Sequence, residues 1–511
     1  MFDIIVKNGS ACKSKENETV LSSLAAGGIA LSAPCGGRGI CGKCRVILQK
    51  GKIKLTEGSG RELGPGDSFP ACQGIPLSDI TIEIPPEDSE IQKPLQNRKV
   101  KPKKILRAGV GIDIGTTTVQ AELVDLETGE SLETATALNA QRSFGADVMS
   151  RIDASRKGKT KELFTAINRQ IEEMLRAYIC DWKLTGIEKC VVSANTAMLH
   201  LFCNVDPSGL GEVPFTPVFL KEQHFSGREL NLSASQVTTL PGISAFVGAD
   251  IVSGLALLDI LRHRENAFFV DIGTNGEMAL WKAQERRLLC TSTAAGPCFE
   301  GAEISCGMSA LPGAINRIEA ASNSTLPFNY GPIFYSTLGN AQPQGICGSG
   351  LVDAIAALKK LNAIDETGAL CETYSESGFF AAEGIAITQK DIRQFQLAKS
   401  AILSGINILC KRAGFESKRE LKTAYIAGGL GFFIDLPNAV NAGLLPAEFA
   451  GRQDGKSKTI VCGNTSLKGA VKCLFDPAFL PYCRSIAALS ETESLAAESD
   501  FAEAFAENMY F

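Results

Sequence analysis

Two short stretches of the chain share a pattern that constrains its fold more than any other feature. Residues 110–119 read VGIDIGTTTV, and residues 269–277 read FVDIGTNGE about 160 positions later. In each stretch an apolar, strand-like run ends in an aspartate and an Ile-Gly-Thr turn. Glycine lets backbone N–H groups approach a phosphate, and threonine hydroxyls add donors. One such turn is a weak signal, but the repeat predicts two duplicated lobes facing one nucleotide.

The composition of the chain excludes several classes of protein. A chain of 511 residues can hold about three domains with sizeable cores. Its 21% of charged and 45% of hydrophobic residues are ordinary for a soluble protein, and a net charge of −5 offers no basic field to nucleic acid. No apolar run reaches the roughly 18–20 residues that span a bilayer, and the N-terminus lacks a signal peptide's layout. We therefore expect a cytoplasmic protein without nucleic-acid or membrane partners.

A cluster of cysteines near the start of the chain predicts an iron–sulfur site. Cys35, Cys41, Cys44 and Cys72 follow the spacing C-x5-C-x2-C-x27-C. Four thiolates on a glycine-rich loop and a distant strand suit a [2Fe–2S] cluster, because the glycines let N–H groups turn toward the sulfides. The alternative is a structural zinc site, which usually has two C-x2-C pairs, whereas the distal cysteine here is alone. We predict these four cysteines as cluster ligands.

The segments around the cysteines delimit a ferredoxin-type domain over residues 1–88. Residues 2–7, 44–49 and 80–84 have strand-like patterns, and residues 19–30 have helical spacing. A linker follows over residues 89–107. Its stretch 91–107 contains seven Lys or Arg and no acidic residue. We interpret it as a solvated connector, and alternatively as a basic arm that steers an acidic redox partner.

The remainder, residues 108–511, alternates apolar strands with amphipathic helices and is expected to be α/β. We expect lobe I over about 108–262 plus a C-terminal helix, and lobe II over about 263–475. The segment from Ser485 carries six acids and no base, and it is predicted to be an amphipathic helix packed on the first lobe. A partner-binding tail is the alternative.

Four polar side chains at ends of these elements are candidate site residues. Asn195 and Thr196 follow a strand and could contact phosphate or water, although an Asx turn also explains Asn195. Asp250 opens a helix, either as its N-cap or in a catalytic or metal-linked role. Glu277 follows the second turn and could orient an attacking water, since phosphoryl transfer depends on positioning and charge stabilisation.

Two glycine-rich turns are candidate nucleotide contacts. The segment GICGSG, with Gly348 and Gly350, precedes a predicted helix whose first N–H groups could bind an anion. The segment AGGLG follows a predicted strand, so that an adenine ring could rest on backbone at Gly428, Gly429 and Gly431.

Taken in chain order, these motifs resemble those of a known superfamily. The two DIGT turns, the GICGSG loop and the AGGLG turn look like the phosphate-1, phosphate-2, connecting and adenosine motifs of the ASKHA superfamily, which includes sugar kinases and actin. With the ferredoxin module and the ordered segments SANTAMLH, FVGADIVSGL, VDIGTNGEMAL and AAGPCFEGAEISCGM, the chain is similar to the reductive activators of corrinoid enzymes. The resemblance implies an α+β, β-grasp ferredoxin joined to an α/β two-lobed ASKHA (actin-like ATPase) domain.

The resemblance also implies a function and a set of site residues. The family uses ATP and a [2Fe–2S] cluster to return inactive Co(II) to Co(I) in a corrinoid protein of a methyltransferase system, with electrons from a low-potential donor. Asp113 and Asp271 would coordinate the Mg²⁺ of the nucleotide. The phosphates would be held by both turns, through Gly115, Thr116, Thr117, Gly273, Thr274 and Asn275.

Other functions remain open from the residues alone. An ATP-driven activator of another low-potential enzyme, such as a dehydratase or reductase, usually holds its cluster between two ATPase subunits. A small-molecule kinase with a fused ferredoxin would need an aspartate base, for which Asp250 is the candidate. A chaperone-like ATPase would have no use for a redox cluster.

Two departures from the family pattern bear on these expectations. Family members can carry a middle domain between linker and ATPase lobes, but here Asp113 follows the linker almost at once, so we expect that domain to be absent. A homodimer that depends on it is therefore only a possibility. The chain also lacks a cysteine-rich C-terminal [4Fe–4S] region, since Cys473 and Cys483 are too few and too far apart.

Overall fold

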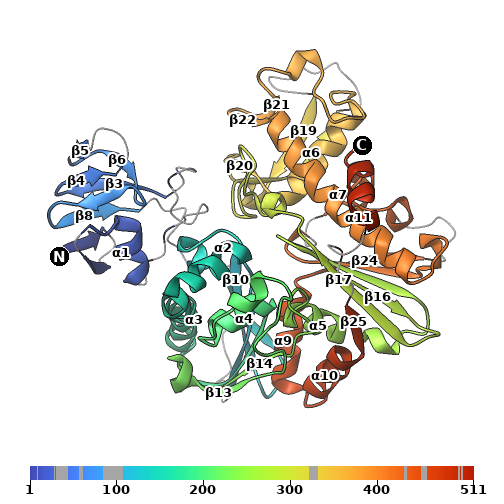
Figure 1. The fold of residues 1–511 in the computed structure, drawn as a ribbon, viewed down its shortest axis with the longest axis horizontal. Coiled ribbons are helices and arrows are strands. Elements are labelled where there is room, and N and C mark those ends of the chain that lie inside the picture. Colours follow the sequence, from blue (N-terminus) through green and yellow to red (C-terminus); the bar gives the residue numbers. More distant parts are fainter. Residues whose placement is uncertain are drawn as a thin grey trace. The chain divides into compact units, whose positions relative to one another are not determined.

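The chain divides into two compact units, seen in a computed structural model (Figure 1). The structure describes all residues except 8–9, 16, 28, 30, 32–38, 40–43, 57–60, 85–106, 322–331, 431–433, 451–456, 493–494 and 496–498. The first unit comprises Met1–Ser253 and Ser466–Arg484, and the second comprises Gly254–Thr465 and Ser485–Phe511. The expected lobe boundary at about residue 262 thus lies inside the second unit.

The N-terminal module is a β-grasp fold, as predicted. Its main sheet has the order β2-β1-β8-β3-β6, with β1 and β8 parallel in the middle, and a small sheet has the order β5-β4-β7. Thr19 caps the helix α1, whose residues Val20, Leu21 and Leu24 are buried against the sheet. The elements are β1 (Phe2–Val6), β2 (Ala11–Ser14), α1 (Val20–Ala26), β3 (Arg45–Lys50), β4 (Ile53–Leu55), β5 (Glu62–Leu63), β6 (Ser68–Pro70), β7 (Gly74–Pro76) and β8 (Ile80–Glu83).

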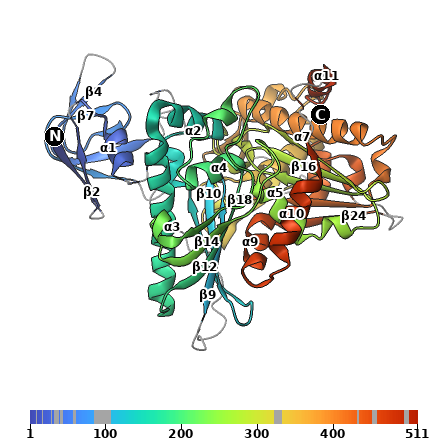
Figure 2. The same ribbon diagram turned by 60° about the horizontal axis from the view of Figure 1, so that its bottom comes forward.

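The rest of the first unit is built on a six-stranded sheet of order β11-β10-β9-β12-β14-β13. Strands β9, β12 and β14 are parallel, while β10 and β11 extend the sheet as an antiparallel hairpin. Apolar residues spaced by four in the sequence predict a helix seam, and all of them lie on α3, which runs along this sheet (Figure 2): Leu163, Ile167, Ile171, Leu175 and Ile179. The elements are β9 (Ala108–Ile114), β10 (Thr118–Asp125), β11 (Ser131–Leu138), α2 (Val148–Ala154), α3 (Thr160–Trp182), β12 (Ile187–Ala194), α4 (Thr196–Phe202), β13 (His224–Ser226), β14 (Ala234–Thr239), α5 (Ala249–Leu257), α9 (Thr465–Phe475) and α10 (Phe479–Leu489).

The second unit repeats this arrangement in five strands, while its sixth strand, β25, lies at the opposite end of the sheet from β13. Its main sheet has the order β24-β23-β15-β16-β17-β25, with β15, β23 and β24 parallel and β15, β16 and β17 antiparallel. The hairpin β15–β16 therefore corresponds to β9–β10, and β23 corresponds to β12. This correspondence confirms the duplication that the two DIGT turns predict.

Smaller sheets and helices complete the second unit. A sheet of order β19-β18-β20 and the hairpin β21–β22 pack with the long helices into one core. The elements are β15 (Ala267–Ile272), β16 (Gly276–Lys282), β17 (Arg287–Thr293), β18 (Ala314–Ala320), β19 (Ile333–Thr337), β20 (Gly345–Ile346), α6 (Gly348–Lys360), β21 (Phe379–Ala382), β22 (Ile385–Ile387), α7 (Gln389–Arg412), β23 (Thr423–Ala427), α8 (Leu436–Asn441), β24 (Lys458–Gly463), β25 (Ser490–Thr492) and α11 (Ser499–Glu507).

The prediction that the acidic segment from Ser485 packs on the first lobe was wrong. Strand β25 joins the sheet of the second unit beside β17, and α11 lies against α7 of the same unit (Figure 1). Polar groups on α7 explain why α11 packs on the second unit, because Gln396 and Lys399 donate hydrogen bonds to backbone carbonyls that follow α11. The C-terminal segment that does rejoin the first unit is Ser466–Arg484.

Among the described helices, none combines the length and the apolar character that crossing a bilayer requires.

Candidate functional site

The first DIGT turn places Asp113 at the carboxyl end of β9, beside the N-terminus of α9. The Oγ of Ser466 donates a 2.7 Å hydrogen bond to Asp113 Oδ1 and lies 2.9 Å from the Oγ of Ser193. Both serines are buried. Hydrogen bonds that donate to a carboxylate favour its charged form. The Ser466 hydroxyl therefore orients the Asp113 carboxyl group at the end of the strand.

A second carboxylate, Asp250, lies close to Asp113 at the start of α5. Burial raises the pKa of Asp250, and the Asp113 carboxylate raises it further. Two carboxylates that repel each other in a partly buried place are a suitable ligand set for a divalent cation, which removes the repulsion. Asp250 Oδ1 accepts the N–H of the next residue, Ile251, at 2.9 Å. Because Asp250 lies inside the first turn of α5 and not before it, an ordinary N-cap does not describe the geometry.

Gly248 brings the chain close enough for this arrangement. A Cβ at Gly248 would lie 2.5 Å from the Cα of Asn195 and 2.8 Å from Asp250 Oδ1. A side chain at this position would therefore displace the segment that carries Asp250.

Asn195 links the phosphate turn to a helix. Its Oδ1 caps α4 by accepting the N–H of Met198 at 3.0 Å, and its Nδ2 donates to Thr116 Oγ1 at 3.2 Å. The capping role accounts for Asn195 Oδ1, whereas Asn195 Nδ2 contacts the phosphate turn. Thr196 donates its hydroxyl to the Ser244 carbonyl, so it serves packing of the neighbouring loop.

The second DIGT turn places Asp271 at the end of β15, directly opposite Glu277 on β16. Directly opposite residues project from the same face of a sheet, with Cβ atoms about 4.5–5.5 Å apart. Glu277 is 7% exposed, so this is a carboxylate pair of restricted solvent access. The turn between them closes on itself, because Gly273 N–H donates to Asn275 O at 2.9 Å.

Thr274, in this second turn, is held by Glu300. Its Oγ1 donates a 2.8 Å hydrogen bond to Glu300 Oε2, from the glycine-rich segment 294–302. The threonine hydroxyl is thereby oriented, and a third carboxylate lies near the turn.

The adenosine turn begins beside Asp271. Gly428 has φ +93°, and a Cβ there would lie 2.5 Å from both Asp271 Oδ1 and the Ile272 carbonyl oxygen. Only glycine suits that combination of backbone angle and close approach. Gly429 has open space around its Cβ position, as a flat ligand resting on backbone would need. The predicted contact Gly431 lies outside the described residues.

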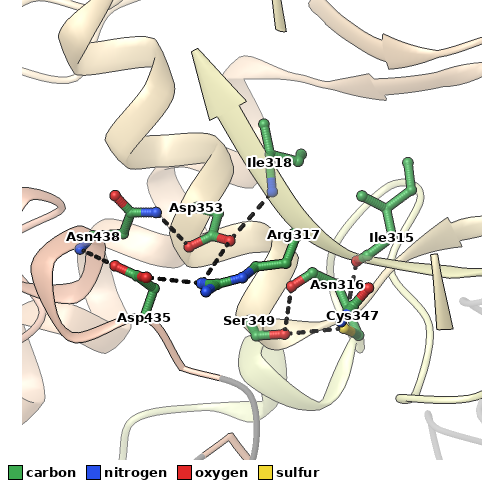
Figure 3. Close-up of polar contacts among 9 residues, drawn as sticks. All are labelled: Ile315, Asn316, Arg317, Ile318, Cys347, Ser349, Asp353, Asp435 and Asn438. Atoms are coloured by element: carbon green, nitrogen blue, oxygen red, sulfur yellow. Dashed lines mark hydrogen bonds and ion pairs between the residues drawn. The ribbon is translucent and has the colours of Figure 1, made fainter. Parts of the chain in front are cut away.

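A polar network holds the helix that follows this turn (Figure 3). Arg317 of β18 donates to Asp435 at 2.9 Å and lies 3.8 Å from Asp353 of α6. Asp353 also accepts from the Ile318 N–H and the Asn438 side chain, and burial raises its pKa to about 6. Asp435 is the N-cap of α8, so the network ties the start of α8 to β18 and α6.

Gly348 and Gly350 have a packing explanation that needs no ligand. Both are buried at the start of α6, where a Cβ would lie 2.1 Å from the Phe299 carbonyl oxygen and 2.2 Å from that of Ile315, respectively. Their contact with a nucleotide stays a prediction.

Of the four predicted cluster ligands, two lie in described residues. Cys44 precedes β3 and Cys72 follows β6, and the Cys44 carbonyl accepts the Ala71 N–H at 2.7 Å. Adjacent strands therefore bring these two cysteines together at one end of the sheet, as the spacing predicts. Cys35 and Cys41 lie outside the described residues. Cys12 lies outside the cysteine loop in the sequence, and in the structure it packs against Gly27 and the core of the module.

Sequence reasoning missed two serines that complete the first turn. Ser193 is the residue before the last one of β12 and Ser466 is the second residue of α9, and both are far from Asp113 along the chain. Their local sequence gives no signal of these contacts, because they depend on how β12 and α9 pack beside β9.

Comparisons with known proteins give the family. In chain order, the models that match are a 2Fe-2S iron-sulfur cluster binding domain over residues 5–77, the RACo middle region over residues 108–263, and the C-terminal ASKHA domain of RACo over residues 265–511. The chain belongs to the RACo family. The predicted combination of ferredoxin and ASKHA domains is thereby confirmed.

Relatives of this RACo-family protein align along most of its length. The corrinoid activation enzyme RamQ of Eubacterium limosum is 28% identical, with 97% of this chain and 96% of the relative covered. The [Co(II) methylated amine-specific corrinoid protein] reductase of Methanosarcina barkeri is also 28% identical, over 70% of this chain and 68% of its own. A solved reductive activator for a corrinoid, iron-sulfur protein has a TM-score of 0.72 at 27% identity, covering 100% and 98% of the two chains. The predicted resemblance to reductive activators of corrinoid enzymes is confirmed.

The expectation that the RACo middle domain is absent was wrong. Residues 108–263 match the model of that region. The same residues form the sheet β11-β10-β9-β12-β14-β13, whose strand order parallels that of the second unit. The sequence motif identified them as an ATPase lobe, and this lobe and the middle region occupy the same residues.

Proposed function

We propose that this protein reductively activates a corrinoid protein at the expense of ATP, by one-electron reduction of Co(II) to Co(I). The observation that carries the proposal is the union, in one chain, of a 2Fe-2S domain with both RACo domains, at full-length similarity to named corrinoid activators. This combination favours a corrinoid activator over the two alternatives, an activator of another low-potential enzyme and a small-molecule kinase with a fused ferredoxin.

The physical demand explains why two such parts are joined. A potential gap of about 200–400 mV in a one-electron step costs about 5–10 kcal/mol. That is comparable to the free energy of ATP hydrolysis. Closure of ATPase lobes on a nucleotide can couple this energy to the binding and release of a partner.

Cys35, Cys41, Cys44 and Cys72 are the proposed ligands of the [2Fe–2S] cluster, which supplies the single electron. The described pair fits this role, since Cys44 and Cys72 lie at the same end of neighbouring strands and are both largely buried. Restricted solvent access around a cluster is one of the protein's means of tuning its potential.

The ATP and Mg²⁺ assignments rest on the donor sets of each unit. In the first unit, Asp113 and Asp250 form a carboxylate pair whose charge a divalent cation would balance. In the second, Asp271 and Glu277 oppose each other, and Gly428 keeps the space beside Asp271 free of a side chain. We assign Mg²⁺ coordination to Asp113 and Asp271, with Asp250 in support, and water orientation to Glu277.

The remaining parts of the proposal concern the partners. We propose a low-potential electron donor as a partner, because the cluster must be reduced again after each one-electron transfer. We also propose a homodimer, since the middle region, on which dimerisation was expected to depend, matches residues 108–263.

The decisive experiment mixes the reduced protein with an oxidised corrinoid protein, with and without MgATP, and follows the cobalt absorbance. Growth of the Co(I) band that depends on ATP is the expected result. Absence of that band, or equal growth without ATP, would overturn the proposal.

The cluster assignment is tested with a matched pair of cysteine variants. Cys44→Ser should remove the visible cluster spectrum and the Co(I) band, whereas Cys12→Ser, in the same module, should keep both. A Cys44→Ser protein with a full cluster would contradict the ligand assignment.

A further inference from the structure

The first phosphate turn is held in place by donors from outside it. The Gly115 carbonyl accepts Asn139 Nδ2 at 2.7 Å, the Thr116 carbonyl accepts Arg151 Nη2 at 2.5 Å, and the Thr117 carbonyl accepts the Asn139 N–H at 2.8 Å. Three consecutive carbonyls of the turn thus each have a partner, supplied by only two residues.

Both partners are rigidly placed. Arg151 lies on α2, is fully buried, and also donates to the Gly145 carbonyl at 3.1 Å while its Nη1 lies 3.1 Å from the sulfur of Met198. Asn139 is 1% exposed, and its Oδ1 accepts the Gln141 N–H at 2.9 Å. Neither side chain can turn away without losing several contacts.

The direction of the carbonyls determines the direction of the turn's N–H groups. A trans peptide carries its C=O and its N–H on opposite sides. The N–H groups of Thr116, Thr117 and Thr118 therefore point away from Asn139 and Arg151. Successive N–H groups that converge on one side of a turn form an anion-binding concavity.

We infer that Asn139 and Arg151 are positioning residues that preform the phosphate-binding turn at residues 115–117. The inference rests on the proposed use of ATP and names the residues that prepare one half of that site. Asn195 completes the arrangement by holding the Thr116 hydroxyl from the side of α4. Because the turn is already arranged, the bound nucleotide does not have to supply the free energy of ordering it.

Matched variants of the full-length protein test this inference. Arg151→Met and Asn139→Ala remove donors that hold the turn. Arg156→Met removes an arginine that donates to the Ser208 carbonyl instead, and Asn168→Ala removes a buried asparagine that donates to the carbonyls of Phe164 and Phe202. The controls thus lose hydrogen bonds to backbone carbonyls away from the turn, which are buried at Asn168 and exposed at Arg156.

The measurements are the dissociation constant for MgATP and the thermal midpoint of the nucleotide-free protein. All four variants should lower the midpoint, because each loses hydrogen bonds to backbone. Only Arg151→Met and Asn139→Ala should also weaken MgATP binding, by about tenfold each, the equivalent of one hydrogen bond. In the Co(I) assay these two variants should raise the KM for ATP more than they lower kcat.

The outcomes separate this inference from the proposed function. If Arg151→Met does not fold, Arg151→Lys, which keeps the charge but loses the planar fork, takes its place. MgATP affinities of the turn variants within twofold of the two controls would overturn the inference. A wild-type protein that does not bind MgATP would instead overturn the proposed function.

Discussion

The two DIGT turns start from the same strand–turn–strand geometry and acquire different surroundings. Asp113 accepts a hydrogen bond from the Ser466 hydroxyl and lies near Asp250, a carboxylate on α5. Asp271 faces Glu277 on the adjacent strand and lies beside the backbone of Gly428. The duplicated motif sets the position of a carboxylate, and the elements packed around each copy set its chemistry.

The turns themselves differ in the same way. The first is held through its carbonyls by Asn139 and Arg151. The second closes through its own Gly273–Asn275 hydrogen bond and through the contact of Thr274 with Glu300. We interpret the first as a preformed anion site and the second as a turn whose hydroxyl is oriented by a neighbouring carboxylate.

The largest effect should come from removing either motif aspartate. Asp113→Ala and Asp271→Ala should each reduce ATP-dependent Co(I) formation by about 100-fold or more, as expected when a charged group that holds a cation is lost. The visible cluster spectrum should not change, and Asp125→Ala, at the far end of β10, should behave as wild type. Loss in only one of the two aspartate variants would break the functional equivalence of the turns.

Substitution of Gly428 should produce the next largest effect. Gly428→Ala imposes a Cβ at φ +93° and 2.5 Å from Asp271 Oδ1. A strain of about 1–3 kcal/mol corresponds to a loss of about 5–150-fold in MgATP affinity, measured by titration calorimetry. Gly186→Ala serves as the control, since its Cβ position is open. Equal affinities would contradict the close approach described for the second site.

The carboxylate pair of the first site predicts a pH-dependent stability. The pKa of Asp250 is raised to about 7, so the folded state retains a proton that the unfolded state loses near pH 4. Stability therefore falls as the pH rises between these values. In magnesium-free buffer at pH 8, Asp250→Asn should raise the thermal midpoint by about 3–6 °C, and the gain should shrink toward pH 4.

The corresponding measurement with MgATP sharpens the comparison. Saturating MgATP should stabilise the wild-type protein more than the Asp250→Asn variant, because a cation relieves the repulsion only where both carboxylates are present. A midpoint for Asp250→Asn that is below that of wild type at pH 8 without magnesium would refute the proximity of the two charges.

The smallest expected effect concerns the hydroxyl that distinguishes the first turn. Ser466→Ala removes the 2.7 Å hydrogen bond to Asp113. A hydrogen bond to a charged group contributes about 1.5–3 kcal/mol when buried, but a partly exposed acceptor can recruit water, so we expect a decrease of about 5–10-fold in the ATP-stimulated rate. Thr165→Val, on the exposed side of α3, is the control. An unchanged rate would show that this hydrogen bond does not prepare Asp113 for the ATP-dependent reaction.

The parts of the fold that could be predicted from the sequence are those that depend on contiguous residues. The two DIGT turns, the cysteine spacing and the seam of α3 are local patterns, and each follows from strand or helix periodicity. From them the two-lobed arrangement and the family could be inferred before the structure was seen.

The parts that sequence reasoning missed depend on distant segments. Ser466 and Arg151 reach the first turn only because α9 and α2 pack beside it, and nothing in their local sequence marks that destination. The terminal helix α11 was assigned to the wrong lobe for the same reason. Its amphipathic face was evident, but the choice between lobes depends on donors such as Lys399 on α7.

The return of α9 to the first unit has a consequence for biosynthesis. Asp113 and its hydrogen-bond partner Ser466 are 353 positions apart, and Ala470 and Leu474 of α9 belong to the core of the first unit. At about 5–20 residues per second, a ribosome needs about 20–70 s to travel from one to the other. During that interval the core of the first unit lacks the residues of α9. A chain that is truncated before α9 would therefore have an incomplete first unit. Asp113 is therefore synthesised early in the ATPase domain, but it gains its hydrogen-bond partner Ser466 only near the end of synthesis.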